Sequence, residues 1–178
     1  KSWGYIEGEE FRTPDSLVDD LIDIVSKNGL LLLNIGPRPD GTIPDEAQKL
    51  LLDMGKWLAA NGEAIYGSRP WKIFGEGPTP VLTGGFTDRK QRSFTGEDIR
   101  FTTKGTTLYA IALDWPGKSM TVKSFGAGSK LLDKSIDSVS LLGSTQPLKC
   151  KQESEGLKIE LPESKPGNYA FLFRIKTR

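Results

Sequence analysis

The sequence contains no histidine, a single cysteine and no long apolar run, and each shortage excludes a class of function. Without histidine, the chain cannot hold a Ser-His-Asp triad, a Cys-His pair or a zinc site with histidine ligands. Proton transfer would have to rest on carboxylates, lysine or tyrosine. With Cys150 alone, no disulfide forms within the chain. Its place in an expected strand favours a small packing residue over a nucleophile.

The sequence also has no excess of positive or negative charge. The chain has 24 Lys and Arg residues against 23 Asp and Glu residues, for a formal net charge of +1. Because the basic residues are dispersed, we expect neither nucleic acid nor a membrane surface as a partner. No apolar run approaches the roughly 18 residues that a membrane-spanning helix needs. The composition, 37% hydrophobic and 26% charged, is typical of a globular protein.

The first part of the chain alternates between helix and strand patterns. Thr13-Pro14-Asp15 begins a helix, and Asn28-Gly29 ends it, with the glycine expected in the left-handed conformation. Residues 30–35 then place four leucines in a row, which predicts a strand buried on both faces. A second helix opens at Pro44-Asp45-Glu46, whose two acids are explained by the helix dipole, and closes at Asn61-Gly62.

Helix, buried strand and helix in succession predict an α/β fold. Two helices cannot cover a parallel strand on both faces, and its parallel neighbours are missing. We therefore expect more α/β protein before Lys1, which is also an abrupt start for a natural chain.

From about residue 79 the pattern changes to short β-rich runs separated by turns. These runs predict an antiparallel sandwich, while the glycines, prolines and mixed charges of residues 72–95 predict a linker. The expected strands are Ile99–Thr103, Thr106–Asp114, Met120–Phe125, Ser138–Leu142, Leu148–Gln152, Leu157–Leu161 and Tyr169–Ile175.

Four blocks of this sequence resemble the α-L-fucosidases of glycoside hydrolase family 29, in the family's order and spacing. They are Ser2-Trp3-Gly4-Tyr5, Leu31–Pro37 with Asp40-Gly41, Gly55–Leu58, and Asn61–Gly67 with Arg69-Pro70-Trp71. The resemblance implies the C-terminal portion of an enzyme that releases terminal α-linked L-fucose from glycans. Its fold class would be α/β plus all-β: residues 1–71 as the last βα units of an incomplete (β/α)8-like barrel, and residues 72–178 as linker and β-sandwich.

The resemblance also implies a retaining mechanism with an Asp nucleophile and a Glu acid/base, both upstream of the Ser-Trp-Gly-Tyr block. We therefore assign no catalytic residue, metal ligand or cofactor to this chain, and expect it to be inactive alone. The implied partners are a fucosylated glycan and the N-terminal portion of the same enzyme, and a homo-oligomer stays open. Family relatives are lysosomal, secreted or periplasmic, which leaves the compartment undecided.

Three residues are the candidates for substrate binding: Trp3, Tyr5 and Asn34. The Trp3 indole can stack on a fucose ring, or it can anchor a loop by packing. Tyr5 can offer a hydroxyl to the same rim, although packing is favoured. The Asn34 amide, at the end of the leucine run, can meet substrate, but a tie from the strand end to a neighbouring loop is favoured.

Other conspicuous residues favour structural interpretations. Glu7, Glu9 and Glu10 fit a solvated loop better than an acid/base pair, and the 36–41 loop lacks the Gly-Lys-Ser/Thr of a phosphate loop. The 61–66 block predicts a helix exit, with Gly62 as left-handed cap and Ile65 and Tyr66 packed beneath. Arg69, Trp71 and Lys72 are expected to join barrel to sandwich, with the arginine stacked on the indole.

Two other readings remain. The sandwich could be a non-catalytic carbohydrate-binding or interaction module, although Tyr109, Trp115, Tyr169 and Phe171 look like core or strand ends. The chain could also be an independent small α+β protein. Against this, exposing Leu30–Ile35 would cost several kcal/mol at roughly 25 cal/mol per Å².

Overall fold

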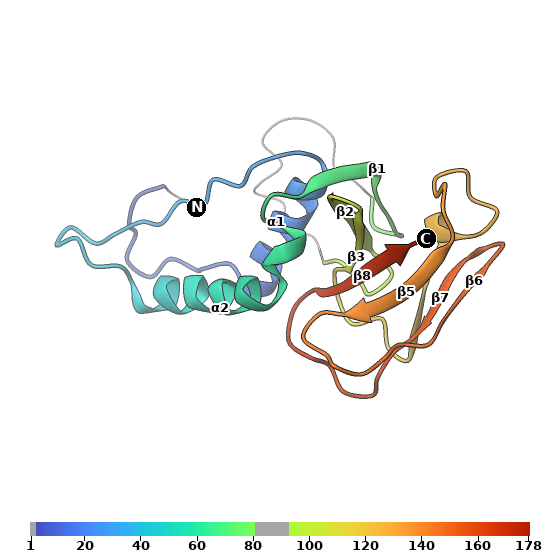
Figure 1. Ribbon diagram of the computed structural model, residues 1–178. Coiled ribbons are helices and arrows are strands. Elements are labelled where there is room, and N and C mark those ends of the chain that lie inside the picture. Colours follow the sequence, from blue (N-terminus) through green and yellow to red (C-terminus); the bar gives the residue numbers. More distant parts are fainter. Residues whose placement is uncertain (1–2, 81–92) are drawn as a thin grey trace.

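A computed structural model describes residues 3–80 and 93–178 (Figure 1). Within these ranges the chain forms helices α1 (Pro14–Ser26) and α2 (Asp45–Asn61), the latter followed by the 3₁₀ turn Gly62–Ala64. The strands follow: β1 (Arg69–Glu76), β2 (Ile99–Lys104), β3 (Thr107–Ala112), β4 (Ser119–Val122), β5 (Ile136–Leu141), β6 (Cys150–Glu153), β7 (Gly156–Glu160) and β8 (Phe171–Thr177). No helix of the described residues is long and apolar enough to cross a membrane.

Both ends of α1 follow from local chemistry. The Thr13 hydroxyl oxygen accepts a hydrogen bond from the Ser16 amide at 3.2 Å, as expected of an N-cap. At the other end, Asn28 and not Gly29 takes the left-handed conformation, with φ of 65°. Gly29 is needed for space instead, because a Cβ there would lie 2.7 Å from the Ile24 side chain.

The end of α2 also differs from the prediction. Gly62 is right-handed, with φ of −61° and ψ of −15°, and the chain tightens into the 3₁₀ turn. The carbonyl of Gly62 accepts the amides of Ile65 at 3.1 Å and Tyr66 at 2.7 Å, so no left-handed cap is required. Ile65 is buried as expected, but Tyr66 is 60% exposed.

The leucine run is not a strand in this chain, so that prediction is wrong for the described residues. The segment runs between α1 and α2 without ladder partners there, and a strand needs neighbours to pair its backbone. Leu30 and Leu32 are each 95% exposed, while Leu31 and Leu33 are half-buried and Leu33 packs on the core beside the helices. One side of the run is covered and the other is bare.

The predicted β-sandwich is confirmed. One sheet has the order β1-β2-β3-β8-β5 and the other β4-β7-β6, and every pairing is antiparallel. Between the sheets lies a core whose centre includes Phe101, Phe125 and Phe173, none of them exposed to solvent. Cys150 is exposed, contrary to the expectation of a packing residue, because it lies on edge strand β6.

Part of the expected linker is the edge strand β1, which pairs with β2, so the linker prediction is wrong for Lys72–Glu76. Residues 81–92 of that linker lie outside the described residues. On either side of them, Thr79 and Thr95 both donate hydrogen bonds to the Asp98 carboxylate. Burial would raise the pKa of Asp98, but these hydrogen bonds hold it below its ordinary value.

Helix α1 lies against β1 and β2 on the outer face of the five-stranded sheet, while α2 packs on α1 and approaches the sheet only with its C-terminal half (Figure 1). The residues expected to join the parts do not do so. Trp71 packs within the sandwich, 5.2 Å from Phe101 and 5.1 Å from Phe125 between ring centroids, and Lys72 pairs with Asp133 at 2.8 Å. The Arg69 guanidinium donates to the Ser68 carbonyl.

Other groups hold the helical layer to the sheet. The Asp23 carboxylate on α1 binds Arg100 on β2 at 2.7 Å, and the Trp57 indole nitrogen donates to the Ala170 carbonyl at 3.0 Å. Each bond crosses from a helix to the sheet layer. These contacts, together with the apolar side chains between them, place the two parts in one packed body.

Candidate functional site

The candidate site forms where the segment before α1 meets the loop after the leucine run. The Asn34 side-chain amide donates to the Trp3 carbonyl at 2.6 Å. Two residues further on, Gly36 approaches the backbone between Gly4 and Tyr5 so closely that a Cβ would lie 2.9 Å from it. The structure therefore brings together residues that are 31 positions apart, and it confirms that Asn34 ties this loop to its neighbour.

The loop itself is braced by its own polar groups. One Asp40 carboxylate oxygen accepts from both the Thr42 amide at 3.0 Å and the Thr42 hydroxyl at 2.7 Å, a local turn that aspartate favours. These hydrogen bonds hold the pKa of Asp40 below its ordinary value. The Arg38 amide donates to the Thr42 carbonyl at 2.7 Å, which closes the loop.

The aromatic candidates differ in exposure. The Trp3 side chain is 87% exposed, so its indole faces are not used in packing within the described residues. Tyr5 is 38% exposed, and the Arg38 guanidinium lies 5.9 Å from its ring centroid. Sequence reasoning missed this role of Arg38, since nothing in the spacing of the two residues indicates it.

Beside Tyr5 and Asn34 lies a hollow of about 190 Å³. Its walls combine apolar side chains of α1, α2 and the leucine run with polar groups from the first segment. They include Leu17, Leu33, Leu50, Glu9, Glu10 and Arg12. Such a hollow, with an exposed indole nearby, is able to bind a sugar ring through its C–H face and hydroxyls.

Carboxylates of the first segment also lie at this site. Glu7 and Glu10 are exposed, and Glu9 is half-buried. Within residues 3–80 and 93–178, no three His, Cys, Asp or Glu side chains are grouped so as to hold a metal ion. The groups described at this site are suited to binding and orienting a ligand.

Comparison with known proteins matches both parts of the chain. Residues 1–63 match the family model "Alpha-L-fucosidase", and residues 91–176 match "Alpha-L-fucosidase C-terminal domain". The tissue α-L-fucosidase of Bos taurus is 32% identical over 173 residues, which cover 93% of this chain and 31% of that protein. The α-L-fucosidase of Branchiostoma floridae is also 32% identical, over 99% of this chain and 36% of its own length.

Solved structures of α-L-fucosidases also resemble this chain in fold. The crystal structure of the Thermotoga maritima α-fucosidase with a mechanism-based inhibitor superimposes with a TM-score of 0.75 at 28% identity, covering 97% of this chain and 37% of that one. The chain thus spans about a third of the length of these relatives. By fold and by both family matches, it belongs to the α-L-fucosidases of glycoside hydrolase family 29, as a fragment of the catalytic barrel followed by the C-terminal β-sandwich domain.

Proposed function

We propose that this chain is the C-terminal portion of a retaining α-L-fucosidase that hydrolyses terminal α-L-fucosyl linkages of glycans. The observation that carries the proposal is the bare side of the leucine run. Leu30 and Leu32, each 95% exposed, lie in an extended segment whose flanking helices are already in place. A parallel barrel strand has this character when its neighbours come from another part of the protein.

The partner in this proposal is the N-terminal portion of the same enzyme. Pairing with it would satisfy the backbone of residues 30–35 and bury the two exposed leucines. At roughly 25 cal/mol per Å², burial of two leucine side chains stabilises the joined protein by several kcal/mol. The loop carrying Asn34 would then lie at the carboxyl end of a barrel strand, where barrel enzymes place their substrate sites.

In this proposal, the catalytic carboxylates and the sugar-binding residues come from different portions of the enzyme. The Asp nucleophile would attack the anomeric carbon while a Glu protonates the leaving oxygen, with the two carboxyl groups about 5–5.5 Å apart. We place both outside this chain. The role left for Trp3, Tyr5 and Asn34 is to bind and orient the sugar: the indole against the ring's C–H face, Tyr5 at the rim, and Asn34 as the brace that positions Trp3.

The proposal is tested by assaying an aryl α-L-fucoside with two proteins: the 178-residue chain, and the same chain joined to the upstream portion encoded before Lys1. We expect no turnover by the first and turnover by the second. Turnover by the 178 residues alone would contradict the placement of the catalytic pair. A joined, folded protein without fucosidase activity would contradict the proposed reaction.

Replacing Trp3 with alanine in the joined protein is expected to lower kcat/KM for the aryl fucoside by about tenfold, mainly through KM, because the variant removes the aromatic face on which the sugar would stack, a loss of about 1.4 kcal/mol. The melting temperature should not change, since Trp3 is 87% exposed. Tyr66→Ala, which removes an aromatic ring that is 60% exposed outside the site, is the control. Equal kinetics for wild type and Trp3→Ala would remove Trp3 from the site.

A further inference from the structure

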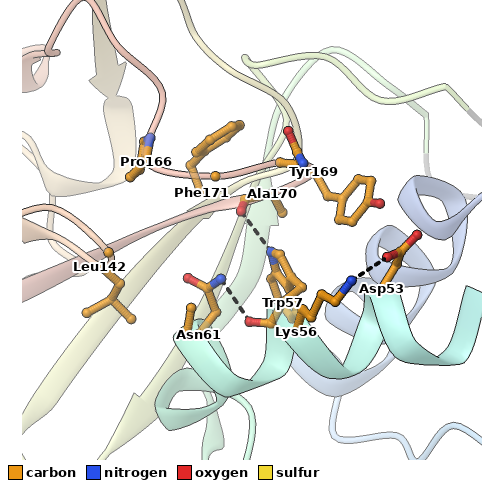
Figure 2. A pocket seen from close by; sticks show the side chains of 13 residues that line it. Asp53, Lys56, Trp57, Asn61, Leu142, Pro166, Tyr169, Ala170 and Phe171 are labelled. Carbon is orange, nitrogen blue, oxygen red and sulfur yellow. Dashed lines mark hydrogen bonds and ion pairs between the residues drawn. The ribbon is translucent and has the colours of Figure 1, made fainter. Parts of the chain in front are cut away.

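A second hollow, of about 260 Å³, lies at the C-terminal half of α2, against the loop that leads into β8 (Figure 2). The first hollow contacts Ala47, Leu50 and Leu51 of α2, whereas this one contacts the helix between Asp53 and Asn61. The two hollows have no lining residue in common, and Leu51 and Asp53, two positions apart, point to roughly opposite faces of the helix. The two hollows are therefore separate sites on one helix.

The apolar walls of the second hollow are rigid. The Trp57 indole, 5% exposed, is fixed by its hydrogen bond to the Ala170 carbonyl at 3.0 Å, and Ala170 lies on the same side of it as Pro166 and Phe171 (Figure 2). The Phe171 ring is itself buried against Trp115, with ring centroids 4.8 Å apart. Leu142 closes one end. A ligand entering here meets surfaces that need no rearrangement, which lowers the entropic cost of binding.

Tyr169 stands at the other end in a strained backbone conformation. Its φ is 68°, and a bulky residue at positive φ is a genuine outlier that the surrounding structure must enforce. The neighbouring loop residues Gly167 and Asn168 adopt such angles more readily than tyrosine does. The strain places an aromatic ring at the hollow, beside Asp53 (Figure 2).

The polar groups of the hollow are balanced in charge. Asp53 is paired with Lys49 at 2.8 Å and with Lys56 at 3.4 Å. The Asn61 amide nitrogen donates to the Trp57 carbonyl at 3.0 Å, which leaves the Asn61 oxygen as an acceptor for a ligand. Carboxylate, ammonium and amide together offer both donors and acceptors without a net field that would select an ion.

We propose that this hollow is a non-catalytic subsite for one neutral pyranose unit of a glycan. The half-buried Tyr169 ring matches the C–H face of such a ring, the buried Trp57 indole forms the floor, and the Asp53, Lys56 and Asn61 side chains match its hydroxyls. The volume, just below the range of drug-sized pockets, suits a single sugar ring. The subsite binds without hydrolysis, so it stands or falls independently of the proposed fucosidase activity.

The test is saturation-transfer NMR on the full 178-residue chain with L-fucose, D-galactose and N-acetyl-D-glucosamine as separate probes. We expect one of the three to bind with a dissociation constant on the order of 1 mM, and Tyr169→Asn to weaken that binding by about tenfold. Asparagine tolerates positive φ, so this variant removes the ring and keeps the loop. Asn61→Ala serves as a second variant on a different element.

Two control variants complete the design. Trp3→Ala removes the indole at the first site, and Tyr66→Ala removes an exposed ring outside both hollows. Binding that is lost in Tyr169→Asn or Asn61→Ala and kept in both controls supports the subsite. Binding of none of the three sugars, binding that survives both hollow variants, or binding lost only in Trp3→Ala overturns it.

Discussion

Replacing Asp23 with alanine is expected to lower the free energy of unfolding by about 3–5 kcal/mol, because it would leave the Arg100 guanidinium buried without its counter-ion. The Asp23 carboxylate receives the Arg100 Nε at 2.7 Å, and the two residues are only 5% and 2% exposed. Burial would raise the pKa of Asp23, but hydrogen bonds from Lys27 and Arg100 lower it overall, so the carboxylate stays charged.

The surroundings of Arg100 make the loss hard to compensate. Its guanidinium lies 5.5 Å from the Phe74 ring centroid and 5.2 Å from that of Phe94. Aromatic rings stabilise the cation but supply no acceptor in the plane of its N–H groups. Water therefore has little room to replace the carboxylate, and α1 would lose its polar attachment to β2.

Urea denaturation of wild type and variant measures the effect, with Asp20→Ala as the matched control on the same helix. Asp20 pairs with Arg12 at 2.6 Å, but both side chains are about 30% exposed, so its loss should cost less than about 1 kcal/mol. The double variant Asp23→Leu with Arg100→Met should recover most of the stability, because it leaves no buried charge unpaired. Lys27, which also pairs with Asp23 at 2.6 Å, is 29% exposed and can turn to solvent. A cost below 1 kcal/mol for Asp23→Ala would show that the ion pair does not anchor the helix.

Local chemistry made much of the fold predictable. The start of α1 at Thr13 and the strands β3 and β7 each depend on residues within one element, and each lies close to the predicted range. Strand β1 was missed because Gly75, Gly77, Pro78 and Pro80 resemble a linker. A register shift between Pro70 and Gly75 also interrupts its pairing, which removes the alternation that marks a regular strand.

Contacts between distant residues were not predictable. Asp23 and Arg100 are 77 positions apart, and Trp57 and Ala170 are 113 apart, so no spacing rule connects them. The leucine run shows a different limit: its composition indicates a buried environment, but in the part of the chain that the structure describes Leu30 and Leu32 are each 95% exposed. The apolar pattern of a segment indicates the environment that the segment requires. Whether the chain provides that environment depends on its tertiary contacts, which the pattern does not contain.

The candidate site divides in the same way. The family resemblance and side-chain chemistry indicated Trp3 and Tyr5, and the expected strand end indicated Asn34, whose hydrogen bond to the Trp3 carbonyl is present. The second hollow had no signal in the sequence, because its walls come from α2, from the loop before β8 and from residues 142–143. Tyr169 was expected only as a strand end, and positive φ at a tyrosine cannot be predicted from its neighbours.

The free energy of unfolding is expected to fall as the pH is raised from about 4 to about 8, because Asp19 is buried as a neutral acid. Asp19 is 3% exposed, and its Oδ1 has no hydrogen-bond partner among the residues that the structure describes. Burial, followed by the charges of Asp15, Asp20 and Asp114, raises the pKa of Asp19 to about 8, and Arg100 lowers it only in part.

The direction of the change in unfolding free energy with pH follows from which state, folded or unfolded, binds the Asp19 proton more tightly. An unfolded aspartate loses its proton near pH 4, whereas the folded chain keeps that of Asp19 up to about pH 8. Between these values the folded state binds more protons, so stability is greatest on the acid side and declines until the folded group also ionises. At about 1.4 kcal/mol for each pKa unit, the decline attributable to Asp19 reaches several kcal/mol at most.

The Asp19→Asn variant should flatten this slope, since an amide fills the same space and never ionises. Urea denaturation at pH 5 and at pH 9 measures it: wild type should be the less stable of the two proteins at pH 9, and the gap should shrink at pH 5. Asp133→Asn is the control, because Asp133 is an exposed carboxylate paired with Lys72 and its charge is not among those that raise the pKa of Asp19. If Asp19→Asn and wild type show parallel stability from pH 5 to pH 9, the Asp19 carboxyl is ionised in the folded protein. In that case, the charge of the Arg100 guanidinium outweighs burial and stabilises the Asp19 carboxylate.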